Sequence, residues 1–311
     1  MKVGGSLVGD AGRVLVAAKR YLIALYIANL ILGWFATFGL SSRIGAVTGT
    51  SLYAERLVHG LDLGAFLELI NKPEIAPYSQ APLALAFSAI FVAFQLFLTG
   101  GIITQYLTAA ESVDRNRFYA SCGENFWRML RIAIVFFLAA GLVGGVLHVV
   151  RSGLDSATEN SSLRAGLTLQ CGMLLIEALA LLWLRMWFDL AQTELIASGA
   201  RRIRSSLTAG FKSARTAAPL YAAYVFNGIL TLLVGALGTY VWWTWVPPSR
   251  VVMSFLILQS TLACLLILRW WQRALAAAWY VRNNPLPVAA ASVVLAPLPP
   301  ESAVPEVPLS Q

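Results

Sequence analysis

Residues 117–150, RFYASCGENFWRMLRIAIVFFLAAGLVGGVLHVV, join the two patterns that decide the fold. The first part is basic, with Arg117, Arg128 and Arg131, whereas residues 132–150 contain no Asp, Glu, Lys or Arg. An apolar tract of about 20 residues, rising about 1.5 Å per residue, can cross a hydrocarbon layer about 30 Å thick. The stretch therefore predicts a membrane-spanning helix that is preceded by a basic amphipathic helix.

The same apolar pattern recurs along the whole chain. The protein has 311 residues, of which 58% are hydrophobic and 12% charged, whereas soluble domains have about 25% charged residues. Five more apolar tracts have the length of a span, and they cover residues 21–40, 81–104, 167–187, 219–243 and 251–271. The tract at 21–40 lacks the short apolar core and the A-x-A-like cleavage site of a signal peptide, so we expect it to be retained as a span. We predict an all-α polytopic membrane protein with six transmembrane helices.

The distribution of basic residues predicts the orientation. The terminal segments, the loops at 105–131 and 188–218, and the span ends at Arg185 and Arg269 hold 17 of the 23 Lys and Arg, and the opposite loops hold six. Lys and Arg are enriched on the cytoplasmic side of membrane proteins. Both termini are therefore expected in the cytoplasm, in a bacterial inner membrane. The net charge of +8 then points to anionic inner-leaflet lipid as the partner, not to nucleic acid.

A second basic segment, RRIRSSLTAGFKSAR at 201–215, resembles 117–131. Wound as a helix, each segment has a basic stripe and an apolar stripe, as in helices that lie in the membrane interface. Two interpretations remain open: topology signals alone, or specific contact with lipid or a partner. The predicted lipid-phosphate and interface residues are Arg117, Arg128, Arg131, Arg185, Arg201, Arg202, Arg204, Lys212, Arg215 and Arg269.

An offset of 84 residues relates parts of the chain to one another. It pairs the two basic segments, and it also pairs LLWLRMW (181–187) with LLILRWW (265–271). A single offset that explains both comparisons indicates an internal duplication. Because each unit would cross the membrane twice, the copies would keep one orientation, which predicts a parallel repeat.

The predicted organisation has three parts. Residues 1–20 form a cytoplasmic N-terminal segment, residues 21–283 form the transmembrane domain, and residues 284–311, rich in proline, form a disordered cytoplasmic tail. Residues 41–80 form the outer loop, in which 51–70 has near-helical apolar spacing. This loop is either a capping lid or a lid that gathers a ligand.

Glu177 is the polar residue that stands out inside a predicted span. A charge at that depth costs at least about 2.5–3.5 kcal/mol, so Glu177 should face the bundle interior, find a donor or stay protonated. The candidate partners in other spans are Gln95, Asn227, Asn29 and Gln259, and the first two complete the predicted intramembrane polar site. Glu177 either binds an ion or proton, or is structural glue between helices.

The sequence contains no recognisable catalytic or metal-binding motif. It lacks G-x-S-x-G, H-E-x-x-H, a P-loop and C-x-x-C, and its three cysteines suggest no disulfide framework. Two glycine pairs, Gly100-Gly101 and Gly144-Gly145, are expected to let helices approach closely. We predict no catalytic residue, no metal and no cofactor.

Two stretches carry a resemblance. FLTGGIITQYL at 97–107, and FDLAQTELIASGARRIRSSLTAGF at 188–211 with its acids Asp189 and Glu194, resemble a superfamily of uncharacterised bacterial six-span proteins. This superfamily is similar to the membrane domain of some glycerophosphodiester phosphodiesterases, and the likeness covers about residues 10–283. Since no phosphodiesterase domain is expected at either end, the resemblance implies fold and location but no enzyme activity.

These observations favour a non-enzymatic integral membrane protein that organises or senses lipid, or scaffolds a partner. The alternative is a small transporter or channel that uses Glu177. A membrane-embedded enzyme acting on lipid would need a catalytic constellation that the sequence does not display. The pattern specifies neither a protein partner nor an oligomeric state.

Overall fold

The computed structural model describes residues 6–49, 77–108, 115–158, 163–199, 202–247 and 250–284, together with Gly64, Glu68 and Asn71. Over these residues the chain is all-helical, without a strand. The helices are α1 (Leu7–Ala17), α2 (Lys19–Thr48), α5 (Pro77–Thr108), α6 (Arg115–Thr158), α7 (Leu163–Ser198), α8 (Ile203–Thr216), α9 (Ala218–Trp245) and α10 (Val251–Asn283). Most of the predicted outer loop and tail, and Arg201, lie outside the described residues.

Six of these helices are long and apolar enough to cross a membrane: α2, α5, α6, α7, α9 and α10. A helix satisfies its own backbone hydrogen bonds, which is why apolar tracts in lipid fold in this way. The prediction of a multi-pass all-α membrane protein with six spans is confirmed. The observed helices are longer than the predicted spans, and α7 and α10 extend eleven and twelve residues beyond the predicted span ends at 187 and 271.

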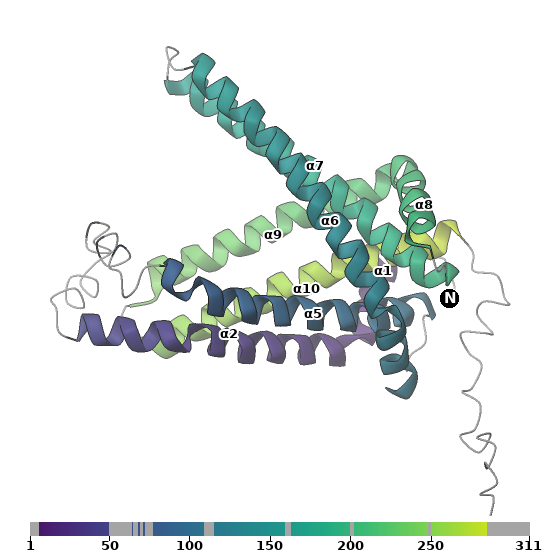
Figure 1. Ribbon diagram of the computed structural model, residues 1–311, viewed down its shortest axis with the longest axis horizontal. Helices are drawn as coiled ribbons and strands as arrows, with labels where there is room; N and C mark the ends of the chain where they lie inside the picture. Colours follow the sequence, from purple (N-terminus) through teal and green to yellow (C-terminus); the bar gives the residue numbers. More distant parts are fainter. Residues whose placement is uncertain are drawn as a thin grey trace, which may run out of the picture.

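The six long helices form a bundle and a projecting arm (Figure 1). Helices α2, α5, α9 and α10 make up the bundle, in which α2 contacts α5, and α9 contacts α10. Helices α6 and α7 contact each other as a hairpin, and their outer halves, 138–158 and 163–178, diverge from the bundle. We call these two segments the arm. None of the arm residues with a described side chain is buried.

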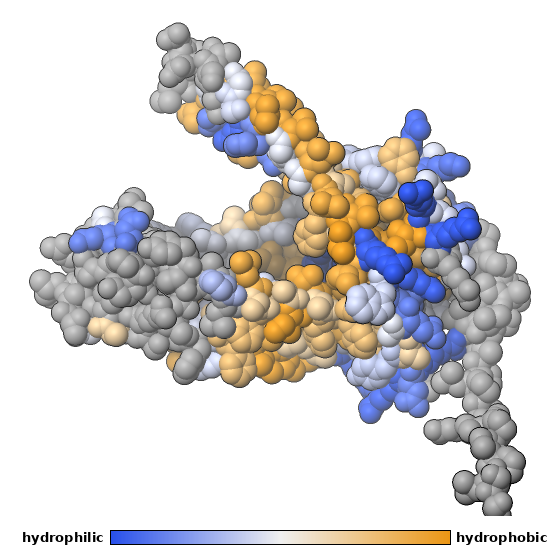
Figure 2. Space-filling model, viewed as in Figure 1, coloured by the Kyte–Doolittle hydropathy of each residue, from blue (hydrophilic) through white to orange (hydrophobic). Residues whose placement is uncertain are grey.

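The core lies at the opposite end of the helices from the tip of the arm. There α1 packs on α10, α8 packs on α7, and the first half of α6 packs on α5. The largest fully buried side chains include Trp270, Tyr106, Tyr224 and Phe118. Hydrophilic residues gather on the surface at this end (Figure 2), which we call the basic end.

The two basic segments differ in structure from each other and from the prediction. Residues 117–131 are not a separate interfacial helix, because they continue into the third span as the 44-residue α6. Residues 203–216 do form a separate helix, α8, which follows Gly199 at φ 61°, a left-handed conformation that favours glycine at a helix C-terminus.

Helix α8 packs against protein along a face of small residues. A Cβ added at Gly210 would lie 2.8 Å from the Cα and N atoms of Ala191 in α7. Of the predicted apolar stripe, Ile203, Leu207 and Phe211 are half-buried and Ala214 is buried. The Phe211 ring stands 5.1 Å from that of Trp187. The Trp187 indole N–H also donates a 2.9 Å hydrogen bond to the Leu207 carbonyl. The small residues thus dock α8 on α7.

The glycine pairs also behave differently from each other. A Cβ on Gly101 would lie 2.6 Å from Cys122 Sγ, so this glycine permits the close contact of α5 with α6. A Cβ on Gly144 or Gly145 would meet nothing within 4 Å. The prediction of close approach is therefore confirmed at the first pair and wrong at the second, which lies on the arm.

The predicted N-terminal segment is part of the folded core. Ser6 caps α1 by accepting a 3.2 Å hydrogen bond from the Gly9 amide. Asp10 is 2% exposed and accepts a 2.8 Å hydrogen bond from Arg282 Nη2 at the end of α10. Gln105 on α5 donates a 3.1 Å hydrogen bond to the Ala17 carbonyl. These contacts join α1 to both α5 and α10.

Candidate functional site

Charged and amide side chains converge where α5, α7 and α10 meet. These three helices contact one another near the basic end. On α7, Arg185 and Asp189 are one helical turn apart, and on α10 Arg269 and Arg273 have the same spacing. Residues at i and i+4 lie on the same face of a helix, so each helix presents two of these side chains together.

Asp189 is the acidic centre of the cluster. It is 5% exposed, and its Oδ2 accepts a 2.9 Å hydrogen bond from the Tyr224 hydroxyl on α9. Arg273 Nε lies 3.7 Å from Asp189 Oδ1, and Arg185 Nε lies 3.9 Å from Oδ2. Both distances exceed hydrogen-bond length, so the carboxylate balances charge without saturating either guanidinium.

Arg273 is held in place by two further contacts. Its Nη1 donates a 2.9 Å hydrogen bond to Thr99 Oγ1 on α5. Its guanidinium carbon lies 4.7 Å from the ring centroid of Trp270, within the range of a cation–π interaction. The Arg273 side chain is 7% exposed, so this cation is fixed and largely shielded from solvent.

The cluster borders a cavity of about 110 Å³. We call this cavity the arginine pocket, and it is lined by Val92, Gln95, Leu96, Ala133, Phe136, Phe137, Arg185, Phe188, Asp189, Gln192, Arg269 and Arg273. The lining comes from α5, α6, α7 and α10. The volume is well above the roughly 10–15 Å³ that a single water requires.

The guanidinium groups of the lining have unused donors. The buried atoms Arg185 Nε and Nη2, Arg269 Nη1 and Arg273 Nε have no hydrogen-bond partner within the described residues. Three arginines face one carboxylate, which leaves two positive charges in excess. Buried polar groups without partners are costly, and guanidinium groups bind phosphate and carboxylate oxygens in particular. The arrangement is suited to binding an anion.

Several residues predicted from the sequence belong to this pocket. Gln95 lies on its lining with Arg185 and Arg269. The sequence suggests that these two arginines extend to lipid phosphate at the inner ends of their spans. In the structure Arg185 instead pairs with Asp189, as the i,i+4 spacing predicts, and its side chain is 25% exposed.

Glu177 lies outside the pocket, on the arm segment of α7, and is half-buried. Three of its four proposed partners have other positions or contacts. Gln95 lines the arginine pocket, Gln259 accepts a 3.0 Å hydrogen bond from the Tyr26 hydroxyl, and Asn227 donates a 3.3 Å hydrogen bond to the Leu268 carbonyl. Within the described residues, no hydrogen bond or pocket thus joins Glu177 to Gln95 or Asn227.

The predicted interface cations lie at the basic end. Those that are exposed are Arg131, Arg202, Arg204, Lys212 and Arg215, whereas Arg117 and Arg128 are half-buried. The Arg215 guanidinium lies 5.9 Å from the ring centroid of Phe211. These side chains form a solvated basic surface distinct from the arginine pocket.

Sequence reasoning missed Arg273, Thr99 and Tyr224, and it treated Asp189 only as a neighbour of Arg185. One signal was present, because the 84-residue offset that pairs Arg185 with Arg269 also pairs Asp189 with Arg273. No comparable signal marks Thr99 or Tyr224, since hydroxyl-bearing residues occur throughout the spans.

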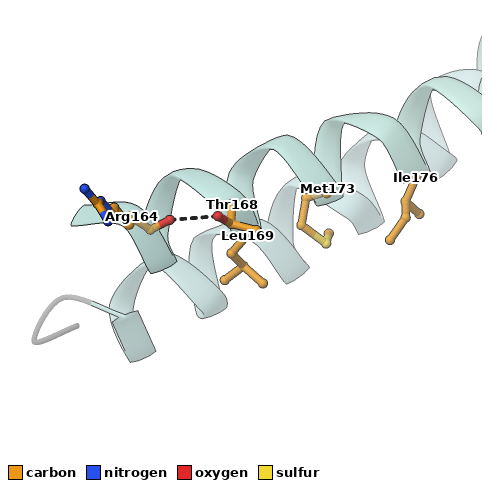
Figure 3. Close-up of a pocket in the computed structure, with 6 residues that line it drawn as sticks. Arg164, Thr168, Leu169, Met173 and Ile176 are labelled. Atoms are coloured by element: carbon orange, nitrogen blue, oxygen red, sulfur yellow. Dashed lines mark hydrogen bonds between the residues drawn. The ribbon is translucent and has the colours of Figure 1, made fainter. Parts of the chain in front are cut away.

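A hollow larger than the arginine pocket lies elsewhere in the described part of the molecule and offers less chemistry. It measures about 550 Å³ and runs along one face of α7 at the outer end of the arm (Figure 3). Its side chains are mainly apolar, and the Thr168 hydroxyl already donates a 2.9 Å hydrogen bond to the Arg164 carbonyl. Arg164 is the one charged residue on this lining.

Comparisons of this chain with known proteins found no relative. No family model, curated protein or solved structure matches this chain. The resemblance to the six-span superfamily therefore stays a prediction.

Proposed function

We propose that this chain is a non-enzymatic, multi-pass protein of the bacterial inner membrane that binds an anionic lipid, with both termini in the cytoplasm. The lipid phosphate would be held in the arginine pocket. The observation that carries the proposal is the set of buried, unpartnered guanidinium nitrogens on Arg185, Arg269 and Arg273 around a single carboxylate. Such groups form strong charge-assisted hydrogen bonds to phosphate oxygens.

The position of the pocket along the helices supports a lipid as the source of the phosphate. At about 1.5 Å per residue, Arg185 lies about 20 Å from the basic end of α7, and Arg273 about 15 Å from that of α10. Arg185 and Arg269 stand where the apolar tracts end, which is the level of lipid headgroups. A soluble anion approaching from the basic end would have to pass the packed core.

The direction in which the pocket opens also supports a lipid as the source of the phosphate. Phe137 of α6 lines the pocket and is 60% exposed, so the lining reaches the surface that faces the acyl chains. Figure 2 shows the hollow between the arm and the bundle, with apolar residues beside it. A lipid could thus place its phosphate in the pocket and its chains in this hollow.

A bound phosphate would link the inner halves of α6 and α7, from which the arm projects, to the bundle. The pocket is lined by these inner halves and by α5 and α10 of the bundle. An anion that bonds to Arg185 and to Arg269 or Arg273 joins helices from both parts. This coupling fits a sensor or organiser of lipid, because occupancy would favour one position of the arm.

The test measures lipid retention by native mass spectrometry of the full chain in detergent, with phosphatidylglycerol, cardiolipin and phosphatidylcholine. Arg269→Gln should lower retention of the anionic lipids at least about tenfold, since a charged hydrogen bond contributes about 1.5–3 kcal/mol. Arg204→Gln on the exposed face of α8 is the matched control and should change retention less than about twofold. Equal losses in both variants would refute a pocket site and leave only surface attraction.

The transport alternative makes a different prediction in the same protein. Glu177→Gln would abolish solute flux in proteoliposomes and leave anionic lipid retention unchanged. Retained flux in Glu177→Gln, or no flux by the unmodified protein across a broad solute panel, would count against transport through this residue.

A further inference from the structure

We infer that the arginine pocket selects a phosphomonoester lipid, one whose phosphate is terminal and carries no headgroup alcohol, over phosphodiester lipids. The inference rests on the proposed function and narrows it to one chemical class.

The charge of the lining matches a dianion. Arg185, Arg269 and Arg273 against Asp189 leave two positive charges in excess. A phosphomonoester carries a charge of about −1.5 to −2 at pH 7, because its second pKa is near 6. A phosphodiester carries a single negative charge, so it would leave one buried guanidinium without a counter-charge, which is unfavourable in a shielded site.

The donors outnumber the oxygens that a diester can offer. Four guanidinium nitrogens are buried without a hydrogen-bond partner in the described residues: Arg185 Nε and Nη2, Arg269 Nη1 and Arg273 Nε, of which the two Nε atoms lie 3.9 and 3.7 Å from Asp189. A monoester phosphate presents three terminal oxygens as acceptors, whereas a diester presents two.

The cavity has room for a phosphate but little beyond it. Its volume is about 110 Å³, and apolar side chains such as Val92, Leu96 and Phe188 fill much of its wall. A diester has two organic substituents on its phosphate. One would follow the acyl chains past Phe137, and the second would have to fit against those apolar side chains. A monoester has one substituent, which leaves by the open side.

The decisive experiment compares dioleoyl phosphatidic acid, a monoester, with dioleoyl phosphatidylglycerol, a diester with the same chains. The full chain is placed in nanodiscs of phosphatidylcholine that contain equal amounts of the two lipids, and the co-purified lipids are quantified. We expect about tenfold enrichment of phosphatidic acid over phosphatidylglycerol, the equivalent of one additional charge-assisted hydrogen bond. Arg269→Gln should bring the ratio close to one, and Arg204→Gln should leave it unchanged.

The outcomes separate the inference from the proposed function. Equal or greater retention of phosphatidylglycerol that still depends on Arg269 would overturn the monoester inference and leave anionic lipid binding standing. Retention of both lipids that is indifferent to Arg269 would overturn both. Displacement of phosphatidic acid by millimolar inorganic phosphate would assign the pocket to a soluble anion and likewise overturn both. Circular dichroism of each variant confirms that a lost preference does not reflect a lost fold.

Discussion

Replacing Asp189 by Asn tests whether this carboxylate stabilises the arginine pocket. Asn keeps the shape of the side chain and an oxygen that can accept the Tyr224 hydroxyl at the present 2.9 Å. It removes the negative charge that lies 3.7 Å from Arg273 Nε and 3.9 Å from Arg185 Nε. The substitution therefore isolates the electrostatic contribution of Asp189.

The magnitude follows from these distances. At an effective dielectric constant of about 20, each pair attracts with about 4 kcal/mol before desolvation is subtracted. Removing one partner of a buried ion pair usually costs about 3–5 kcal/mol. The Arg185 side chain is 25% exposed and neither ion pair is at hydrogen-bond distance, so we expect a loss of about 3 kcal/mol. For a large domain this lowers the apparent Tm by about 6–12 °C.

The assay is thermal unfolding of the purified full chain in detergent, with and without phosphatidic acid. Glu124→Gln, at an exposed acid of α6, is the control and should change stability by less than about 0.5 kcal/mol. Because a bound anion would replace the missing negative charge, phosphatidic acid should raise the Tm of Asp189→Asn more than that of the unmodified protein. If Asp189→Asn unfolds no earlier than Glu124→Gln, the carboxylate is not the counter-charge that the structure suggests.

Three further substitutions test the core and the arm. Gly210→Leu should lower the apparent Tm by several degrees, since overpacking costs about 1–3 kcal/mol. The control Gly235→Ala should leave the Tm unchanged, because a Cβ at this position would meet nothing within 4 Å. Equal Tm values for the two variants would contradict the close packing of α8. Asp10→Ala should remove the 2.8 Å hydrogen bond that Asp10 of α1 accepts from Arg282, and should speed cleavage of the N-terminus in limited proteolysis. An unchanged cleavage rate would show that this bond does not hold α1. Glu177→Gln should shift the Tm by less than about 2 °C, because this half-buried side chain lies on the arm, and a large drop would restore the structural-glue hypothesis.

The spans were predictable because the length and composition of each apolar tract are local properties of the sequence. A run of about 20 residues without charge identifies a membrane helix without reference to other parts of the chain. The relative rotation of the helices carries no such local signal. Gln95 and Glu177 were paired by depth in the membrane, yet Gln95 lies with the arginines and Glu177 lies on the arm. A single sequence indicates how deep a residue lies, but not which neighbour it faces.

The two basic segments show a second reason why the structure differs from what the sequence predicts. A basic stripe opposite an apolar stripe predicts a helix in the lipid interface. In α8 the buried residues are Ser206, Gly210 and Ala214. Only Ala214 belongs to the predicted apolar stripe, and the other two belong to a small-residue face that hydropathy hardly registers. In α6 the basic segment runs into the span without a break, since the sequence there holds no helix-ending residue such as proline. Packing against α7 thus decided the outcome for α8, and the absence of a helix-ending residue decided it for α6.

The 84-residue offset relates the polar positions of the arginine pocket to one another. It aligns α5, α7 and α10, and buried positions recur along all three: Ile102, Met186 and Trp270 are each 0% exposed. Three positions further along the same face, the aligned residues are Gln105, Asp189 and Arg273, which are 4%, 5% and 6% exposed. Three equivalent buried polar positions thus carry a neutral, a negative and a positive side chain.

One helical turn earlier on each helix, the aligned residues are Gly101, Arg185 and Arg269. If α10 carried an acid where Arg273 stands, each arginine would have its own carboxylate and the cluster would be neutral. With arginine at position 273, the site instead has two unbalanced positive charges. Burying such an excess costs free energy unless an anion joins it, and the free guanidinium nitrogens face a cavity that can admit one. The excess positive charge that Arg273 brings therefore accounts for the energetic cost of the pocket and for its suitability for an anion.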